Sequence, residues 1–145
     1  MTNSNSENSI SVIKKLNAPI ERVFAHFTDP DLLALWHNPN QVHTPEISVD
    51  LQVGGAYRFE MKDMESKTHV AVGTYIEIIP NEKLVFSWQW EDGPHPETQV
   101  TVLFKTNDSG TEVELIHEGF TDQEVMGHHN QGWNGLLGNL EKELG

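Results

Sequence analysis

Hydrophobic residues near the C-terminal end of the chain recur at helical spacing. After Trp133, leucines follow at 3, 4, 7 and 11 residues, at Leu136, Leu137, Leu140 and Leu144. This spacing places all five side chains on one face of a helix. Thr121 and Glu124 fit a capping box, which would start the helix at Thr121 and give it about 24 residues. The pattern therefore predicts a long amphipathic helix that packs against an apolar surface.

The N-terminal part of the chain predicts one strand and two short helices. Residues 10–16 are rich in β-branched side chains, and Asn17-Ala18-Pro19 should end that strand and begin a helix. Thr28-Asp29-Pro30 should end this helix and cap a second one. The side chains expected to face inward from the two helices are Ile20, Val23, Phe24, Phe27, Leu32, Leu33, Leu35 and Trp36.

Between Thr44 and Glu118 the apolar residues alternate with polar ones, as they do in half-buried strands. Turn residues divide this segment into six strands, at approximately 45–52, 55–63, 67–79, 83–91, 97–106 and 110–118. Short loops imply antiparallel neighbours, because a parallel pair needs a long crossover connection. We expect an antiparallel meander of six strands, which the first strand joins elsewhere to make about seven.

Alternation along these strands predicts one apolar face and one largely charged face. In residues 83–91, Leu84, Phe86, Trp88 and Trp90 share one side, opposite Val85, Ser87, Gln89 and Glu91. The aromatic side should be the covered one. The fold class expected is α+β, with a curved sheet wrapped around the long C-terminal helix.

Four glycines within the predicted helix require an explanation, because each costs about 1 kcal/mol of helix stability relative to alanine. They are Gly127, Gly132, Gly135 and Gly138. Close packing of the helix backbone against a strand or ring is the favoured interpretation. A kink or hinge near Trp133 is the alternative.

Composition narrows the possible partners and locations. The chain of 145 residues has 9 basic and 22 acidic residues and a formal net charge of −13, so nucleic acid and anionic membranes would repel it. It has no cysteine and no apolar run of membrane-spanning length, which favours a cytoplasmic protein. We expect a disordered tail over residues 1–9 and a single domain over residues 10–145.

An ordered series of short motifs resembles the activator of heat-shock-protein-90 ATPase homologue family, within the START-like, birch-pollen-allergen-like helix-grip superfamily. The resemblance covers nearly the whole chain from Ile10. The motifs are Asn17-Ala18-Pro19, Thr28-Asp29-Pro30, Asp50 to Gly55, Gly73 to Ile78, Leu84-Val85-Phe86, Gly110-Thr111, Glu118-Gly119-Phe120 and Gly132-Trp133.

This resemblance implies a seven-stranded antiparallel sheet around a long C-terminal helix, with two short helices after the first strand. The superfamily's usual activity is binding an apolar ligand between that helix and the sheet. Most members of the family itself have no assigned function. The eukaryotic namesake acts by contacting a chaperone rather than by catalysis.

Large aromatic and sulfur-containing side chains converge on the predicted helix–sheet interface, as they do in many small-molecule pockets. The residues expected to line such a pocket are Trp36, Phe59, Met61, Phe86, Trp88, Trp90, Phe104, His117, His129, Trp133 and Leu137. The alternative is that these residues only fill the core. No residue is assigned as catalytic or metal-binding, and no cofactor is expected.

The chain contains eight histidines, a residue type that binds metals and takes part in acid–base catalysis. His128 and His129 are adjacent on the predicted helix and point about 100° apart, which disfavours a shared metal ion. If the pocket is catalytic, His117, His129 and Glu118 are the candidates for general acid–base roles, because histidine titrates near neutrality and a carboxylate can orient it.

Three functions therefore remain open from the sequence. The first is binding of a small apolar or amphipathic molecule by a non-enzymatic domain. The second is a protein-interaction module in a stress or chaperone context. The third is a cyclase- or dehydratase-like enzyme that uses a pocket histidine. The sequence leaves monomer and homodimer equally open.

Overall fold

The computed structural model of the chain describes residues 8–37, 45–93 and 95–144. The strands are β1 (Ser9–Leu16), β2 (Glu46–Val49), β3 (Ala56–Lys62), β4 (Thr68–Ile79), β5 (Lys83–Trp90), β6 (Thr98–Asn107) and β7 (Gly110–Glu118). The helices are α2 (Ile20–Thr28), α3 (Pro30–Leu33) and α4 (Gln123–Leu144). Residues 1–7 of the expected tail lie outside the described residues, and β1 already begins at Ser9.

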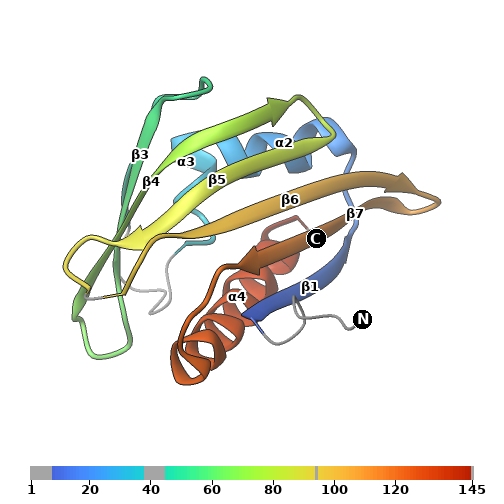
Figure 1. Cartoon of the computed structure of the whole chain (residues 1–145). Coiled ribbons are helices and arrows are strands. Elements are labelled where there is room, and N and C mark those ends of the chain that lie inside the picture. The colour runs from blue at the N-terminus through green and yellow to red at the C-terminus, as the bar shows by residue number, and fades with distance from the viewer. Residues whose placement is uncertain (1–7, 38–44, 94, 145) are drawn as a thin grey trace, which may run out of the picture.

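The seven strands form one antiparallel sheet in the order β1-β7-β6-β5-β4-β3-β2 (Figure 1). Strands β2 to β7 follow one another as a meander, and β1 pairs with β7 at the opposite edge from β2. Helices α2 and α3 follow β1, and the Asp29 side chain accepts a hydrogen bond from the Asp31 amide at the start of α3. The predicted α+β helix-grip fold is confirmed.

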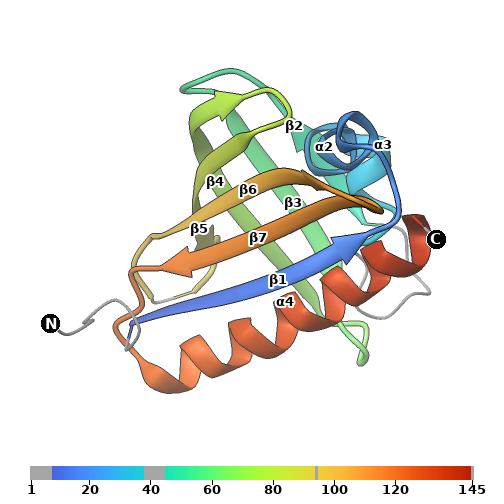
Figure 2. The ribbon, with the colours of Figure 1, turned by 90° about the vertical axis from the view of Figure 1, so that its right-hand side faces the viewer.

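Helix α4 runs alongside β1 (Figure 2). Its buried residues are the ones whose spacing predicted the helix: Trp133, Leu136, Leu137, Leu140 and Leu144. Lys14 of β1 forms an ion pair of 3.0 Å with Glu141 on the exposed side of this contact. The aromatic face of the sheet is covered as expected, with Phe59, Phe86 and Trp88 all buried.

Two local expectations were wrong. Helix α4 begins at Gln123 rather than Thr121, because Asp122 caps it by accepting hydrogen bonds from the amides of Glu124 and Val125. Leu35 is 46% exposed, since the turn after α3 carries it outward. Ser87, on the outer face of β5, is buried, and its hydroxyl accepts a hydrogen bond from the Thr74 amide near a β-bulge in β4.

Within the described residues, no helix combines the length and the apolar character that a membrane span requires. Although α4 has 22 residues, its outer face is polar.

The position of the cap can be tested with two neighbouring substitutions. Asp122→Ala should lower the free energy of unfolding by about 0.5–2 kcal/mol, because it removes the acceptor for the first amides of α4. Thr121→Ala should change it by less than about 0.5 kcal/mol, since Thr121 is exposed and does not cap the helix. Urea denaturation measures both. A larger loss of unfolding free energy in Thr121→Ala than in Asp122→Ala would show that Thr121 caps the helix instead.

Candidate ligand-binding site

A cavity of about 720 Å³ lies between the inner face of the sheet and helix α4. From the sheet and its loops it is lined by Met61, Met64, His69, Trp88, Trp90 and His95. From α4 it is lined by Val125, His128, His129, Gln131, Gly132, Trp133, Gly135, Leu136 and Asn139. Met64, in the turn between β3 and β4, is 79% exposed, so the cavity opens to solvent beside this turn.

The described lining contains no Asp, Glu, Lys or Arg, although the chain carries a formal net charge of −13. The wall is therefore mainly aromatic and aliphatic, with imidazole, amide and indole groups as its polar atoms. Such a lining resembles that of small-molecule pockets, whose volumes are typically about 300–1,000 Å³. Its titratable groups are the histidines His69, His95, His128 and His129, of which His69 contacts the Asp63 carboxylate at 2.8 Å.

One hydrogen bond from the sheet to α4 fixes the position of His129. The indole Nε1 of Trp90 donates to His129 Nε2 at 3.0 Å. Because Nε2 accepts, the proton of the neutral ring must lie on Nδ1, which donates to the Val125 carbonyl at 2.9 Å. Both ring nitrogens of His129 are therefore engaged.

A second hydrogen bond runs in the opposite direction, from α4 to the sheet. The indole Nε1 of Trp133 donates to His117 Nδ1 at 2.9 Å. His117 Nε2 then carries the proton and donates to Thr98 Oγ1 at 2.7 Å. The Thr98 hydroxyl donates onward to the Trp88 carbonyl at 2.9 Å. The chain of donors fixes the tautomer of His117 as well as its position.

The surroundings of these histidines keep the rings neutral. Burial lowers the pKa of His117 to about 3, and the neighbouring His129 adds to the effect. Burial also lowers the pKa of His129, although its hydrogen bond to Val125 partly offsets this. His37, packed beside Trp36, has its pKa lowered to about 3 by burial, partly offset by the Leu33 carbonyl. The indole N–H groups of Trp90 and Trp133 can donate to these histidines only while the rings are neutral, because a protonated imidazole has no acceptor nitrogen.

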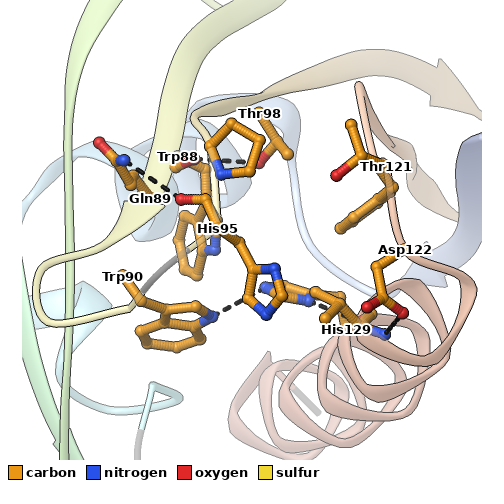
Figure 3. Close-up of a pocket in the computed structure, with 11 residues that line it drawn as sticks. Trp88, Gln89, Trp90, His95, Thr98, Thr121, Asp122 and His129 are labelled. Atoms are coloured by element: carbon orange, nitrogen blue, oxygen red, sulfur yellow. Dashed lines mark hydrogen bonds between the residues drawn. The ribbon is translucent and has the colours of Figure 1, made fainter.

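A smaller pocket of about 20 Å³ adjoins the cavity at the end of β5 (Figure 3). The two share Trp88, Trp90, His95, Val125 and His129. Its remaining lining comes from Gln89, Pro96, Thr98, Phe120, Thr121 and Asp122. A volume of this size holds about one water molecule or one small polar group.

The residues expected to line a pocket fall into two groups. The first group lines the cavity and consists of Met61, Trp88, Trp90, His129 and Trp133. The residues that do not line it are Trp36, Phe59, Phe86, Phe104, His117 and Leu137. His117 lies just behind the wall, where it accepts from Trp133. Leu137 is fully buried on α4, and its neighbour Leu136 faces the cavity instead.

The remaining aromatic residues fill the opposite end of the helix–sheet interface. Phe104 packs edge-on against Phe24 and Phe27, with ring centroids 5.2 and 5.3 Å apart. Trp36 packs 4.8 Å from Phe27 and donates its indole N–H to the His26 carbonyl. Only about 10 Å³ of space remains there, so this end of the interface is solid.

The helix glycines do not pack closely against the sheet, so the favoured interpretation was wrong. A Cβ added at Gly127, Gly132, Gly135 or Gly138 would meet no atom within 4 Å outside the adjacent turns of α4. Gly132 and Gly135 line the cavity. The absence of side chains at these two positions therefore leaves space in the cavity.

Several lining residues carry no signal in the sequence. Met64 and His95 lie in loops, whose placement depends on the tertiary fold, and His69 follows a turn at the start of β4. Leu136 was detectable, since it follows Trp133 by one helical turn. Gly132 and Gly135 were detectable only as helix-weakening residues, with the reason left open.

Of the three candidates for acid–base chemistry, His117 and His129 lie side by side, with ring centroids 5.1 Å apart, and Glu118 lies apart from them. Glu118 follows His117 in β7 and therefore points to the other face, where it borders a separate polar groove with Glu97. His128 and His129 both border the cavity. Among the described residues, no group of three His, Cys, Asp or Glu side chains is arranged to hold a metal ion.

A sequence model of the activator of Hsp90 ATPase homolog 1-like proteins matches residues 17–145. The chain belongs to this family. The match spans both short helices, β2 to β7 and the whole of α4, so every cavity-lining residue lies within the family domain. No protein in a search of curated sequences matches the chain.

Solved structures agree with this family assignment. Protein CV1439 from Chromobacterium violaceum is 28% identical with a TM-score of 0.81, over 94% of this chain and 97% of that one. CalU16 from Micromonospora echinospora is 25% identical with a TM-score of 0.71, over 91% and 73%. An uncharacterized protein from Rhizobium leguminosarum, 23% identical, shares the fold with a TM-score of 0.79 over 94% and 93%.

The neutral histidines predict how the stability of this family member depends on pH. A histidine whose pKa is lowered by folding stabilises the folded state fully at pH values above its unfolded-state pKa, about 6.5. This stabilisation is lost as the pH falls toward the folded-state pKa. For His117 this window runs from about 6.5 to about 3. Within this window, His117 should add about 1.4 kcal/mol per pH unit to the loss of unfolding free energy.

The contribution of His117 can be isolated with His117→Gln, which removes the titrating group and retains a polar side chain. Between pH 6 and 4, its unfolding free energy should fall less steeply than that of the wild type, by about 1.4 kcal/mol per pH unit. Urea denaturation at several pH values measures both slopes. Equal slopes would mean that His117 is not held neutral by the fold.

Proposed function

We propose that this protein binds a small apolar or amphipathic molecule in the cavity between α4 and the sheet. The observation that carries the proposal is the combination of a volume of about 720 Å³ with a largely aromatic and aliphatic lining that contains no Asp, Glu, Lys or Arg. The apolar part of the ligand would lie against Trp88, Trp90 and Trp133. Membership of the family supports the proposal, since binding of hydrophobic ligands is typical of its superfamily.

The rigidity of the wall also supports binding. Trp90 and Trp133 are each held by a hydrogen bond to a histidine, and Trp88 packs between them with ring centroids 5.5 and 5.0 Å away. Side chains that are ordered before the ligand arrives lose little further conformational entropy on binding. The aromatic wall formed by these three tryptophans is therefore ordered before a ligand binds.

The expected affinity follows from the apolar area that a ligand would bury. Burial contributes about 25 cal/mol per Å², so a molecule that loses about 200 Å² of apolar surface gains about 5 kcal/mol. That corresponds to a dissociation constant near 0.2 mM, as an order-of-magnitude estimate before the entropic cost of association. Tighter binding requires polar contacts in addition.

The arrangement of the histidines favours binding over catalysis. A general base must offer a free nitrogen to its substrate. Both ring nitrogens of His117 and of His129 are occupied by hydrogen bonds, and His117 is fully buried. We therefore propose a binding protein, in which these two histidines position the tryptophans.

A substitution that fills the cavity tests this function. Gly135→Leu should project a side chain into the space that the ligand occupies and should not strain the helix, since a Cβ there meets no neighbour. Fluorescence titration with the neutral probe N-phenyl-1-naphthylamine should show binding to the wild type and at least about tenfold weaker binding to the variant, equivalent to 1.4 kcal/mol.

Gly127→Leu is the matched control. Gly127 lies on the same helix, is exposed, has the same free space around a Cβ and does not line the cavity. This variant should keep the wild-type affinity. Absence of a fluorescence increase with the wild type would contradict the proposed function, and equal affinity of all three proteins would place the probe outside the cavity.

A further inference from the structure

The four tryptophans differ in how their indole N–H groups are satisfied. Trp36 donates to the His26 carbonyl, Trp90 to His129 and Trp133 to His117. Trp88 is only 3% exposed, yet its Nε1 has no acceptor among the described residues. A buried donor without an acceptor is unfavourable, and native proteins contain few of them.

The unpartnered indole belongs to the wall of the candidate site. Trp88 lines both the cavity and the small pocket that adjoins it. Figure 3 shows the nitrogen of its ring on the side that faces this pocket, toward His129. The pocket has space for about one oxygen-sized group, as judged from its volume of about 20 Å³.

His117 and His129, the two histidines that hold the neighbouring tryptophans, cannot accept this hydrogen bond. A neutral imidazole has one acceptor nitrogen. That of His129 is used by Trp90, and that of His117 is used by Trp133. The other nitrogen of each ring is a donor, as its own contact requires.

We propose that the indole N–H of Trp88 donates a hydrogen bond to a neutral oxygen acceptor of the bound ligand, such as a ketone carbonyl. This inference rests on the proposed function and specifies the ligand class: a largely apolar, planar molecule with a carbonyl oxygen near one end. The planar part lies along the aromatic wall, and the oxygen enters the small pocket.

The charges around the site favour a neutral acceptor. The small pocket is lined by the Asp122 carboxylate and by no Lys or Arg, and burial lowers the pKa of His129, so a ligand carboxylate there would meet an acidic group and no fixed cation. An ammonium group provides no acceptor for the indole. An uncharged carbonyl therefore fits this pocket better than a carboxylate or an ammonium group.

Two probes of nearly equal shape test the inference. 2-Acetylnaphthalene carries a ketone oxygen, and 2-ethylnaphthalene has a hydrocarbon chain in its place. Isothermal titration calorimetry with the wild type should show about tenfold tighter binding of the ketone, the usual effect of one net hydrogen bond. In Trp88→Phe, which keeps an aromatic ring, the ketone should bind only as tightly as the hydrocarbon.

Leu136→Ala is the matched control, because Leu136 lines the same cavity and its side chain makes no hydrogen bond. It removes apolar surface from the wall, so it should weaken both probes alike and preserve the preference for the ketone. Loss of the preference in Leu136→Ala together with its retention in Trp88→Phe would overturn the assignment.

A second measurement uses the wild type alone. In ¹H–¹⁵N spectra, the indole proton of Trp88 should move downfield when 2-acetylnaphthalene is added and should not do so with 2-ethylnaphthalene. Equal affinities for the two probes without this shift would mean that water satisfies Trp88, which overturns the inference and leaves the proposed function intact. Failure of both probes to bind would overturn the proposed function and the inference together.

Discussion

Two hydrogen bonds between tryptophan and histidine join helix α4 to the sheet, and the geometry of the site depends on them. They run in opposite directions: Trp90 of β5 donates to His129 of α4, and Trp133 of α4 donates to His117 of β7. Each requires a neutral ring, and burial supplies this by lowering the pKa of both histidines. The polar atoms of the interface are thus used mainly to orient aromatic rings.

The helix–sheet interface has two unlike ends. Under α2 and α3, aromatic rings pack edge to face and leave almost no space. Toward the β5–β6 loop, the interface opens into the cavity, where Gly132 and Gly135 present no side chains. The solid end and the two indole–imidazole bonds stabilise the position of α4. The hollow end can then exist without the helix collapsing onto the sheet.

The sequence predicted the elements well because their signals are local. Period-two alternation located the strands, and the spacing from Trp133 to Leu144 located α4 and its buried face. The cap was misplaced because Thr121 and Asp122 are both good capping residues, and only the backbone path decides between them. Leu35 was misplaced because the chain leaves α3 after a single turn.

The site was less predictable, because it depends on how the elements are spaced. The assignment of strand and helix faces identified which residues lie between the sheet and the helix. It could not distinguish the packed end of the interface, which contains Trp36 and Phe104, from the hollow end, which contains Trp88 and Trp133. The glycines indicated something unusual in α4. A sequence cannot show whether such glycines allow close packing or leave an open space, because the residues are the same in both cases. The acceptor of each indole likewise follows only from the tertiary structure.

A crystal structure of the protein soaked with 2-acetyl-6-iodonaphthalene would test the central claim most directly, because anomalous scattering locates the iodine without assumptions. The account predicts one iodine peak inside the cavity, with the naphthalene ring against Trp88 and Trp133 and the ketone oxygen within hydrogen-bonding distance of Trp88 Nε1. A cavity filled by side chains, or iodine bound only on the outer surface, would contradict it.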